Sequence, residues 1–152
     1  MLPSHTILLG KRTKTAGCRV NGPLPDRRCS PGAVYADASL ATICQSGYAS
    51  RVRRVTDKTR AAILREYGLP VRKYGKALEI DHIVPLEIGG SNDPANLYAE
   101  AAAPGLGYHV KDRLERRLKT LVCEKTMPLR NAQRAIGSNW VTLYKQLFGI
   151  TG

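Results

Sequence analysis

The residues best suited to chemistry lie in one acidic stretch, Glu79–Tyr98, which contains no lysine or arginine. This stretch holds His82, one of only three histidines in the chain, directly after Asp81 and 14 residues before Asn96. An imidazole with a pKa near 6.5 can take a proton from water at neutral pH, so His82 is a candidate general base. In an extended strand, neighbouring side chains point to opposite faces, so Asp81 and His82 should serve different roles.

The charge of the chain is unevenly distributed around this stretch. The 152 residues carry a formal net charge of +12, yet residues 78–104 contain five acidic side chains and no basic ones. Residues 1–30, 51–77 and 105–145 hold six, nine and nine basic side chains. Carboxylates repel a phosphate unless a cation lies between them, so the pattern favours a polyanion held by the flanks and a cation held by the acidic stretch. A soluble basic protein with a solvated acidic loop is the simpler alternative.

The elements expected around the histidine are a strand, a loop, a second strand and a helix. Residues 77–84 alternate in polarity and favour a short strand that Pro85 ends. A turn-rich loop with two adjacent glycines follows, and residues 97–99 can return as a second short strand. Apolar side chains at helical spacing predict an amphipathic helix over residues 106–123, which carries His109 near its start.

Further helices are expected on both sides of this segment. Residues 56–68 begin with a threonine cap, continue with apolar side chains at helical spacing and end at a glycine. Another helical stretch begins at 126–128, is interrupted at the sequence GSN of 137–139, and is followed by a last helix over 140–148. Residues 31–44 are ambiguous between strand and helix, and we leave them open.

The cysteines bear on the cellular compartment. Cys18, Cys29, Cys44 and Cys123 include no C-x-x-C pair, which argues against a structural zinc site. An even number favours two disulfides and an oxidising compartment, with free buried thiols as the alternative. Three pairings are possible, and we expect Cys18 with Cys29 and Cys44 with Cys123. We favour a secreted or periplasmic location, although no signal peptide is visible, and no apolar run is long enough for a membrane span.

The segment DHIVPLEIGGSNDPANL, followed by a histidine on a helix, resembles the motif of the HNH endonucleases. That family is a strand–strand–helix module around one divalent metal, with the same histidine-to-asparagine spacing. The specific resemblance covers residues 78–112, and a looser resemblance to small bacterial HNH-type proteins extends to Tyr144. It implies an α+β fold, mostly helical, in which a ββα-metal module packs with additional helices. We expect a nuclease domain over 33–152 with its motif core at 78–123, preceded by a basic Gly/Pro-rich arm or loop over 1–32.

The resemblance also implies roles for individual residues. His82 would activate water, and Asn96 would orient it by holding the loop through hydrogen bonds to the backbone. Asp81 and His109 would bind the metal, although His109 follows Asn96 by 13 residues, more than is usual in the family. One carboxylate and one imidazole leave most positions to water, which suits Mg²⁺, with Mn²⁺ or Zn²⁺ as alternatives. The zinc-binding C-x-x-C pairs that brace many family members are missing here.

The implied activity is metal-dependent hydrolysis of DNA, leaving a 5′-phosphate and a 3′-hydroxyl. No recognition helix stands out, so we expect weak sequence specificity. RNA is an alternative substrate, and no protein partner is indicated. Two rival hypotheses are a nucleic-acid-binding protein on this scaffold without turnover, and a secreted module with a structural metal and a protein partner. The predicted contacts with nucleic acid, for which solvated surface charge is the alternative, are Arg51, Arg53, Arg54, Lys111, Arg113 and Arg116.

Overall fold

The structure is a computed structural model of the chain and describes residues 5–70, 78–101 and 107–149. It combines helices with two small antiparallel sheets, so the predicted α+β class is confirmed. The elements in chain order are β1 (Thr6–Leu8), β2 (Ala33–Tyr35), α1 (Leu40–Ile43), α2 (Tyr48–Val52), α3 (Asp57–Glu66), β3 (Leu78–His82), the 3₁₀-helices η2 (Leu86–Ile88) and η3 (Pro94–Asn96), β4 (Leu97–Ala101), α4 (Tyr108–Cys123) and α5 (Leu129–Phe148).

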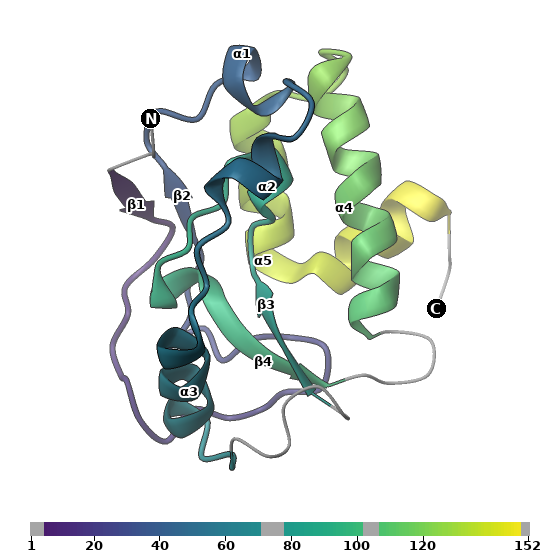
Figure 1. The fold of residues 1–152 in the computed structure, drawn as a ribbon. Helices are drawn as coiled ribbons and strands as arrows, with labels where there is room; N and C mark the ends of the chain where they lie inside the picture. The colour runs from purple at the N-terminus through teal and green to yellow at the C-terminus, as the bar shows by residue number, and fades with distance from the viewer. Residues whose placement is uncertain (1–4, 71–77, 102–106, 150–152) are drawn as a thin grey trace.

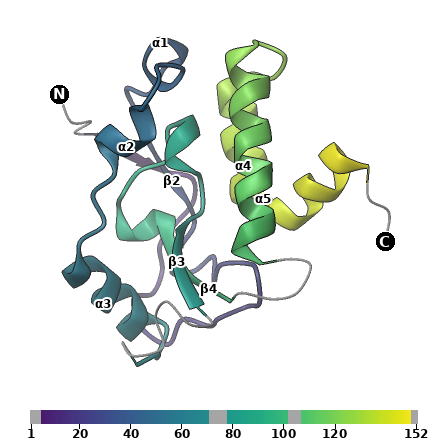
Figure 2. The ribbon, with the colours of Figure 1, turned by 45° about the vertical axis from the view of Figure 1, so that its right-hand side comes forward.

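The hairpin of β3 and β4 lies at the centre of the molecule. Its strands pair antiparallel, from Leu78 opposite Ala101 to His82 opposite Leu97. In both ribbon views the hairpin lies between α3 on one side and α4 on the other, with α5 beside α4 (Figures 1 and 2). The order of strand, strand and helix over residues 78–123 is the one that the sequence predicted.

The helices form where local signals place them. The Thr56 side chain caps α3 by accepting a hydrogen bond from Thr59 N at 3.1 Å, and Gly68, at φ +66°, ends the helix in a left-handed conformation. Helix α5 breaks at Asn139, whose φ of −158° and ψ of 99° are not helical, within the predicted interruption. The ambiguous residues 31–44 supply both a strand, β2, and a short helix, α1.

Two groups of buried side chains form the core. The larger group joins α1, α2, η2, α4 and α5, and Trp140 is its largest fully buried member. The smaller group joins α3 to both strands of the hairpin and includes Cys18 and Cys29. Both expected disulfides are present, Cys18–Cys29 and Cys44–Cys123, which is compatible with an extracellular or otherwise oxidising location.

The N-terminal segment, where the structure describes it, is bound closely to the rest of the molecule. Strand β1 pairs with β2, and the carbonyl oxygen of Pro23 accepts hydrogen bonds from Tyr98 Oη at 3.0 Å and from Trp140 Nε1 at 2.6 Å. Residues 5–32 thus comprise β1 and a long connection that the Cys18–Cys29 disulfide closes into a loop. Within the described ranges, no helix is long and apolar enough to cross a membrane.

Candidate active site

His82 lies at the end of β3 and is only 6% exposed. Its Nε2 lies 3.1 Å from Asn92 Oδ1, and because an amide oxygen only accepts, Nε2 carries the proton. Burial lowers the pKa of His82, and the charges of Arg53 and Lys111 lower it further, against the opposing effect of Asp81. The ring is therefore neutral at neutral pH. No hydrogen bond from the described residues reaches Nδ1, so this nitrogen can accept a proton from water.

Asn92, which the sequence analysis missed, fixes the orientation of the His82 ring. Its Nδ2 donates to Tyr35 Oη at 2.8 Å and to the carbonyl oxygen of Val52 at 2.6 Å. These two bonds identify Nδ2 as the donor end of the amide and direct Oδ1 at the imidazole. The only signal in the sequence was a second asparagine in the loop after His82, and the partners that give it a role come from β2 and α2.

Asn96 is fully buried and holds the loop that follows His82. Its Oδ1 accepts from Ala33 N at 3.1 Å and from Val84 N at 3.0 Å, while Nδ2 donates to the carbonyl oxygens of Val84 at 2.9 Å and Ser91 at 2.8 Å. All four hydrogen-bonding positions of the amide are used. This geometry agrees with the positioning role that the resemblance implies, and the catalytic consequence stays a prediction.

The same loop needs glycine where the sequence has one. A Cβ atom at Gly90 would lie 1.8 Å from the carbonyl oxygen of Val84, so any larger residue would displace the backbone. The close approach brings the chain back toward β2, where Tyr35 N donates to the carbonyl oxygen of Gly89 at 2.9 Å.

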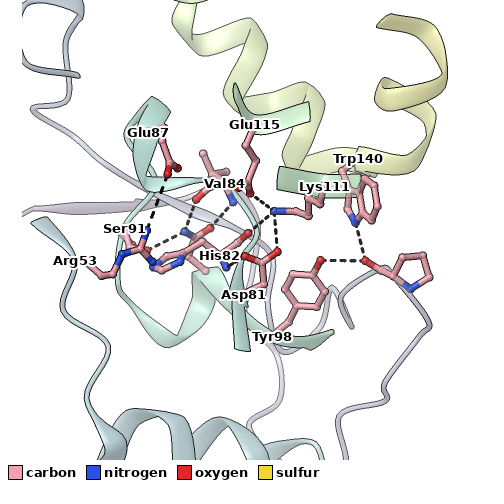
Figure 3. A network of polar contacts seen from close by, with 12 residues as sticks. Arg53, Asp81, His82, Val84, Glu87, Ser91, Tyr98, Lys111, Glu115 and Trp140 are labelled. Atoms are coloured by element: carbon pink, nitrogen blue, oxygen red, sulfur yellow. Dashed lines mark hydrogen bonds and ion pairs between the residues drawn. The ribbon is translucent and has the colours of Figure 1, made fainter. Parts of the chain in front are cut away.

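On the other face of β3, Asp81 lies against a buried lysine (Figure 3). Asp81 Oδ2 is 3.2 Å from the Nζ atom of Lys111, a residue of α4 that is 0% exposed. The same ammonium donates to the carbonyl oxygen of His82 at 2.7 Å and to Glu115 Oε2 at 2.6 Å. One buried cation therefore binds the carboxyl groups of Asp81 and Glu115 and the backbone of the candidate base. Burial raises the pKa of Glu115 to about 8 against the lowering effect of the Lys111 charge.

The protonation states of this network follow from burial and from neighbouring charge. Burial opposes the charged form of Lys111, but the carboxylates around it raise its pKa, and the ammonium stays protonated. Its charge lowers the pKa of Asp81 against the effect of burial. Glu100, on β4, is 0% exposed, and its carboxyl group lies beside Asp81 and Tyr98. Burial, followed by the charge of Asp81, raises the pKa of Glu100 to about 10, so it is neutral at pH 7.

The prediction that Lys111 contacts a phosphate is wrong, because its side chain does not reach the surface. Lys111 lies on the same face of α4 as the buried Leu114, Glu115 and Leu118, at helical spacings of three, four and seven. That face packs toward the acidic stretch, whose carboxylates offer the ammonium the partners that a buried charge requires. The charge of Lys111, which the sequence predicted to contact a phosphate, instead pairs with carboxyl groups in the protein interior.

Among the other residues predicted to contact nucleic acid, Arg53 lies near His82. Its side chain is 52% exposed, its Nη2 is 4.0 Å from Glu87 Oε1, and its charge contributes to the lowered pKa of His82. A long, exposed ion pair of this kind adds little stability, so the guanidinium can turn to another anion at small cost.

The remaining predicted contacts lie elsewhere on the surface. Arg51 is exposed and bonds within its own turn, to the carbonyl oxygen of Ser46 at 2.9 Å. The guanidinium of Arg113 lies 5.2 Å from the ring centroid of Phe148, a cation–π contact. Arg54 and Arg116 are exposed, and their predicted contacts with nucleic acid stay predictions.

The residues as placed do not fit a divalent metal between Asp81 and His109. The Asp81 carboxylate is neutralised by the ammonium of Lys111, which would be repelled by a second cation at 3–4 Å. His109 is exposed in the first turn of α4, and its charge acts on the carboxyls of Glu79 and Asp112, whose pKa values burial raises and His109 lowers. Within the described parts of the chain, no group of three or more histidine, cysteine, aspartate or glutamate side chains is arranged to hold a metal ion.

No family model, no curated protein and no solved structure matches this chain. The chemical interpretation therefore depends on the geometry of the site and on the resemblance of its motif.

Proposed function

We propose that this protein is an endonuclease that hydrolyses phosphodiester bonds in DNA, with His82 as the base that activates water. The observation that carries the proposal is the state of the His82 ring: burial keeps it neutral, Asn92 holds it through Nε2, and Nδ1 has no partner among the described residues. A neutral, oriented imidazole with one open nitrogen is what proton abstraction from water at neutral pH requires.

The surroundings of His82 supply a place for the phosphate. The Arg53 guanidinium beside the ring can donate two parallel hydrogen bonds to phosphate oxygens and stabilise the negative charge that develops during the displacement. The net charge of +12 attracts a polyanion at long range. The succession of β3, β4 and α4 supports the HNH resemblance, because that family is a strand–strand–helix module.

No step of this mechanism passes through a metal ion, because the site does not fit one at Asp81. Lys111 acts as a fixed internal cation that holds Asp81 and the carbonyl oxygen of His82, and its buried side chain does not reach the phosphate. These two contacts fix the end of β3 from one face of the strand. The imidazole of His82 lies on the other face, where the substrate would bind.

Plasmid nicking tests the proposal with purified wild type and His82→Ala, in Mg²⁺, in Mn²⁺ and in EDTA. We expect His82→Ala to lower the cleavage rate by about 10²- to 10⁴-fold, the usual contribution of a general base. The exposed His5→Ala variant is the matched control and should cut like wild type. If His82→Ala cuts as fast as its parent, His82 is not the base. Cleavage that EDTA abolishes would show that a divalent ion takes part in the reaction.

A second candidate function, binding of nucleic acid without cleavage, is favoured by one observation. The carboxylate that the resemblance assigns to a metal is already neutralised by Lys111. Under this alternative, the protein retards DNA in a gel in a salt-sensitive manner but produces no nicks in any divalent cation.

A further inference from the structure

A second basic feature lies apart from His82, between the loop closed by Cys18–Cys29 and the break in α5. It is an open cavity of about 910 Å³, which we call the loop groove. Four cationic side chains line it against one carboxylate, that of Asp26. The four are Lys14, Arg19, Arg27 and Arg28.

Two of the four cations have partners within the protein. Arg27 Nη1 donates to the carbonyl oxygens of Gly137 at 2.7 Å and Ser138 at 2.8 Å, where α5 breaks. Lys14 Nζ lies 3.2 Å from Asp26 Oδ2. Partial burial would raise the pKa of Asp26, but hydrogen bonds from two backbone N–H groups and the Lys14 ammonium lower it. Asp26 is thus ionised and neutralised internally, which limits its repulsion of an anion in the groove.

Arg19 and Arg28 are the cations whose guanidinium groups have no hydrogen bond or ion pair with the described residues. Their backbones, by contrast, are fixed, because Asp26 accepts from Arg19 N at 2.9 Å and from Arg28 N at 3.1 Å. Arg19 follows Cys18 and Arg28 precedes Cys29, and the disulfide holds these cysteines with their Cα atoms 6.1 Å apart. The covalent bond therefore presents two unpaired guanidinium groups at one wall of the groove.

The opposite wall also favours an anion. Asn139 leaves the helical conformation, and its Oδ1 accepts from Thr142 N at 3.0 Å, so it caps a new helical segment that runs to Phe148. Ser138 and Asn139 line the groove at the start of this segment, where the helix dipole is positive. Two independent features therefore line one cavity. They are the two guanidinium groups of Arg19 and Arg28, and the start of a helical segment at Asn139.

We propose that the loop groove binds phosphate groups of a polynucleotide, as a second contact with the DNA that the proposed function places at His82. Guanidinium groups bind phosphate oxygens in bidentate fashion, so two of them lining one cavity suit phosphate groups of a polynucleotide. The groove is large enough for a nucleotide unit, and its apolar wall of Val20, Leu24 and Pro25 can cover a sugar or a base. This inference rests on the proposed function for the identity of its ligand.

The loop groove is separate from the candidate active site. Trp140, which directly follows Asn139, lies on the side of Lys111 away from His82 and Arg53 (Figure 3). A strand that reached both places would have to pass around the β3–β4 hairpin. Contact at the loop groove would therefore add affinity without touching the reacting phosphate.

Binding of a fluorescent 20-base-pair DNA duplex, followed by anisotropy over a range of salt concentrations, tests the inference. All proteins carry His82→Ala so that no cleavage interferes, and Arg19→Ala/Arg28→Ala is compared with the parent. Loss of two phosphate contacts should reduce the slope of log affinity against log salt by about 1.8 (0.9 per contact). The charge-matched control is Arg65→Ala/Arg117→Ala, whose side chains are exposed on α3 and α4, and its slope should change by less than about half of that.

Equal slopes for the groove variant and its parent overturn the proposal. Arg19→Lys/Arg28→Lys, which keeps the charge but not the bidentate geometry, should keep the parent's slope but bind with lower affinity. Its circular dichroism checks that the fold is intact. Competition with mononucleotide and with pyrophosphate separates the sources of phosphate. If either displaces the DNA at its own micromolar concentration and its binding needs both arginines, the groove takes a free ligand and the polynucleotide assignment is wrong.

Nicking assays distinguish this inference from the proposed function. With His82 intact, Arg19→Ala/Arg28→Ala should raise the KM for plasmid nicking, because the variant lacks two contacts that contribute to DNA binding. A protein that never nicks yet shows the slope change refutes the nuclease and retains the groove. A protein that nicks plasmid, but whose groove variant shows no change in the salt slope, supports the nuclease and refutes the groove.

Discussion

On one face of β3 the His82 ring is neutral and held by amide groups, whereas on the other face Asp81 is ionised and held by the buried ammonium of Lys111. The two residues are adjacent, and strand alternation separates their environments. The His82 face borders an exposed arginine, while the Lys111 face is sealed between the hairpin and α4. The imidazole is uncharged, and on the opposite face a sealed ion network holds the backbone that carries it.

The comparison shows where charge costs stability and where it provides function. A buried ion must have a partner, so a substitution of any one charged residue on the Lys111 face should destabilise the protein. The His82 face has no buried ion to compensate, so changes there should alter activity more than folding. Four substitutions test this division, in order of decreasing expected effect.

Lys111→Met should cause the largest loss of stability. It removes the ammonium and leaves Asp81 and Glu115 buried without a cation, which costs about 3–5 kcal/mol in the free energy of unfolding. Urea denaturation followed by circular dichroism measures the effect. Lys119→Met, on the same helix but outside the network, should cost less than about 0.5 kcal/mol. Equal stabilities for the two variants would falsify the structural role of the network.

Glu100→Gln should change the dependence of stability on pH. The folded carboxyl keeps its proton up to a pKa of about 10, against an ordinary value of 4.5, so the free energy of unfolding of the wild type falls as pH rises between these values. Glutamine stays neutral, and the variant should gain up to about 4 kcal/mol relative to wild type between pH 6 and pH 9. The exposed Glu124→Gln, as control, should have the same effect at both pH values. A constant difference for Glu100→Gln would mean that Glu100 is ionised in the folded protein.

Asn92→Ala should affect cleavage more than folding. It removes the acceptor of the Nε2 proton, and a lost partner worth about 1–3 kcal/mol corresponds to roughly a tenfold to hundredfold slower reaction. Plasmid nicking at saturating DNA measures it, with the exposed Asn131→Ala as control. Asn92→Asp would sharpen the test, since a carboxylate acceptor raises the pKa of His82 and should move the acidic limb of the pH–rate profile upward. An unshifted limb would argue against proton transfer by His82.

Arg53→Ala should have the smallest of the four effects. Removal of an exposed guanidinium at His82 should raise KM for plasmid about tenfold or less with kcat reduced only modestly, because its ion pair with Glu87 is long and solvated. The neighbouring Arg54→Ala is the control and should change KM less. If Arg54→Ala raises KM more than Arg53→Ala does, the phosphate approaches His82 from a different side.

Much of the local structure could be predicted because it depends on neighbours in the chain. The Thr56 cap, the helical spacing of Leu114 and Leu118, and the break before Trp140 are each decided within a few residues. The antiparallel pairing of β3 with β4 belongs to the same class, because a loop of about 14 residues with two glycines joins them. The α+β class and the strand–strand–helix order followed from these signals.

The candidate site was predicted only in part, because its electrostatics depend on contacts between distant segments. Asp81, His82 and Asn96 stood out by type and spacing. Lys111 did not, since a lysine on an amphipathic helix is usually solvated, and here three acidic side chains from two strands and a helix surround it. Asn92 acquires its role through Tyr35 and Val52, which are 57 and 40 positions away in the chain.

The sequence by itself determined which residues could carry chemistry, where the helices and the central hairpin form, and that the protein has a net positive charge, because residue type, short-range periodicity and net charge do not depend on the folded arrangement. Only the tertiary structure decided which charges are buried and which are exposed. Burial changes the free energy of a charged group by several kcal/mol, and it is set by packing between segments far apart in the chain. The same packing buried the charge of Lys111 in the interior. It left Arg19 and Arg28 at the surface, where the disulfide between the neighbouring Cys18 and Cys29 holds their backbones near each other.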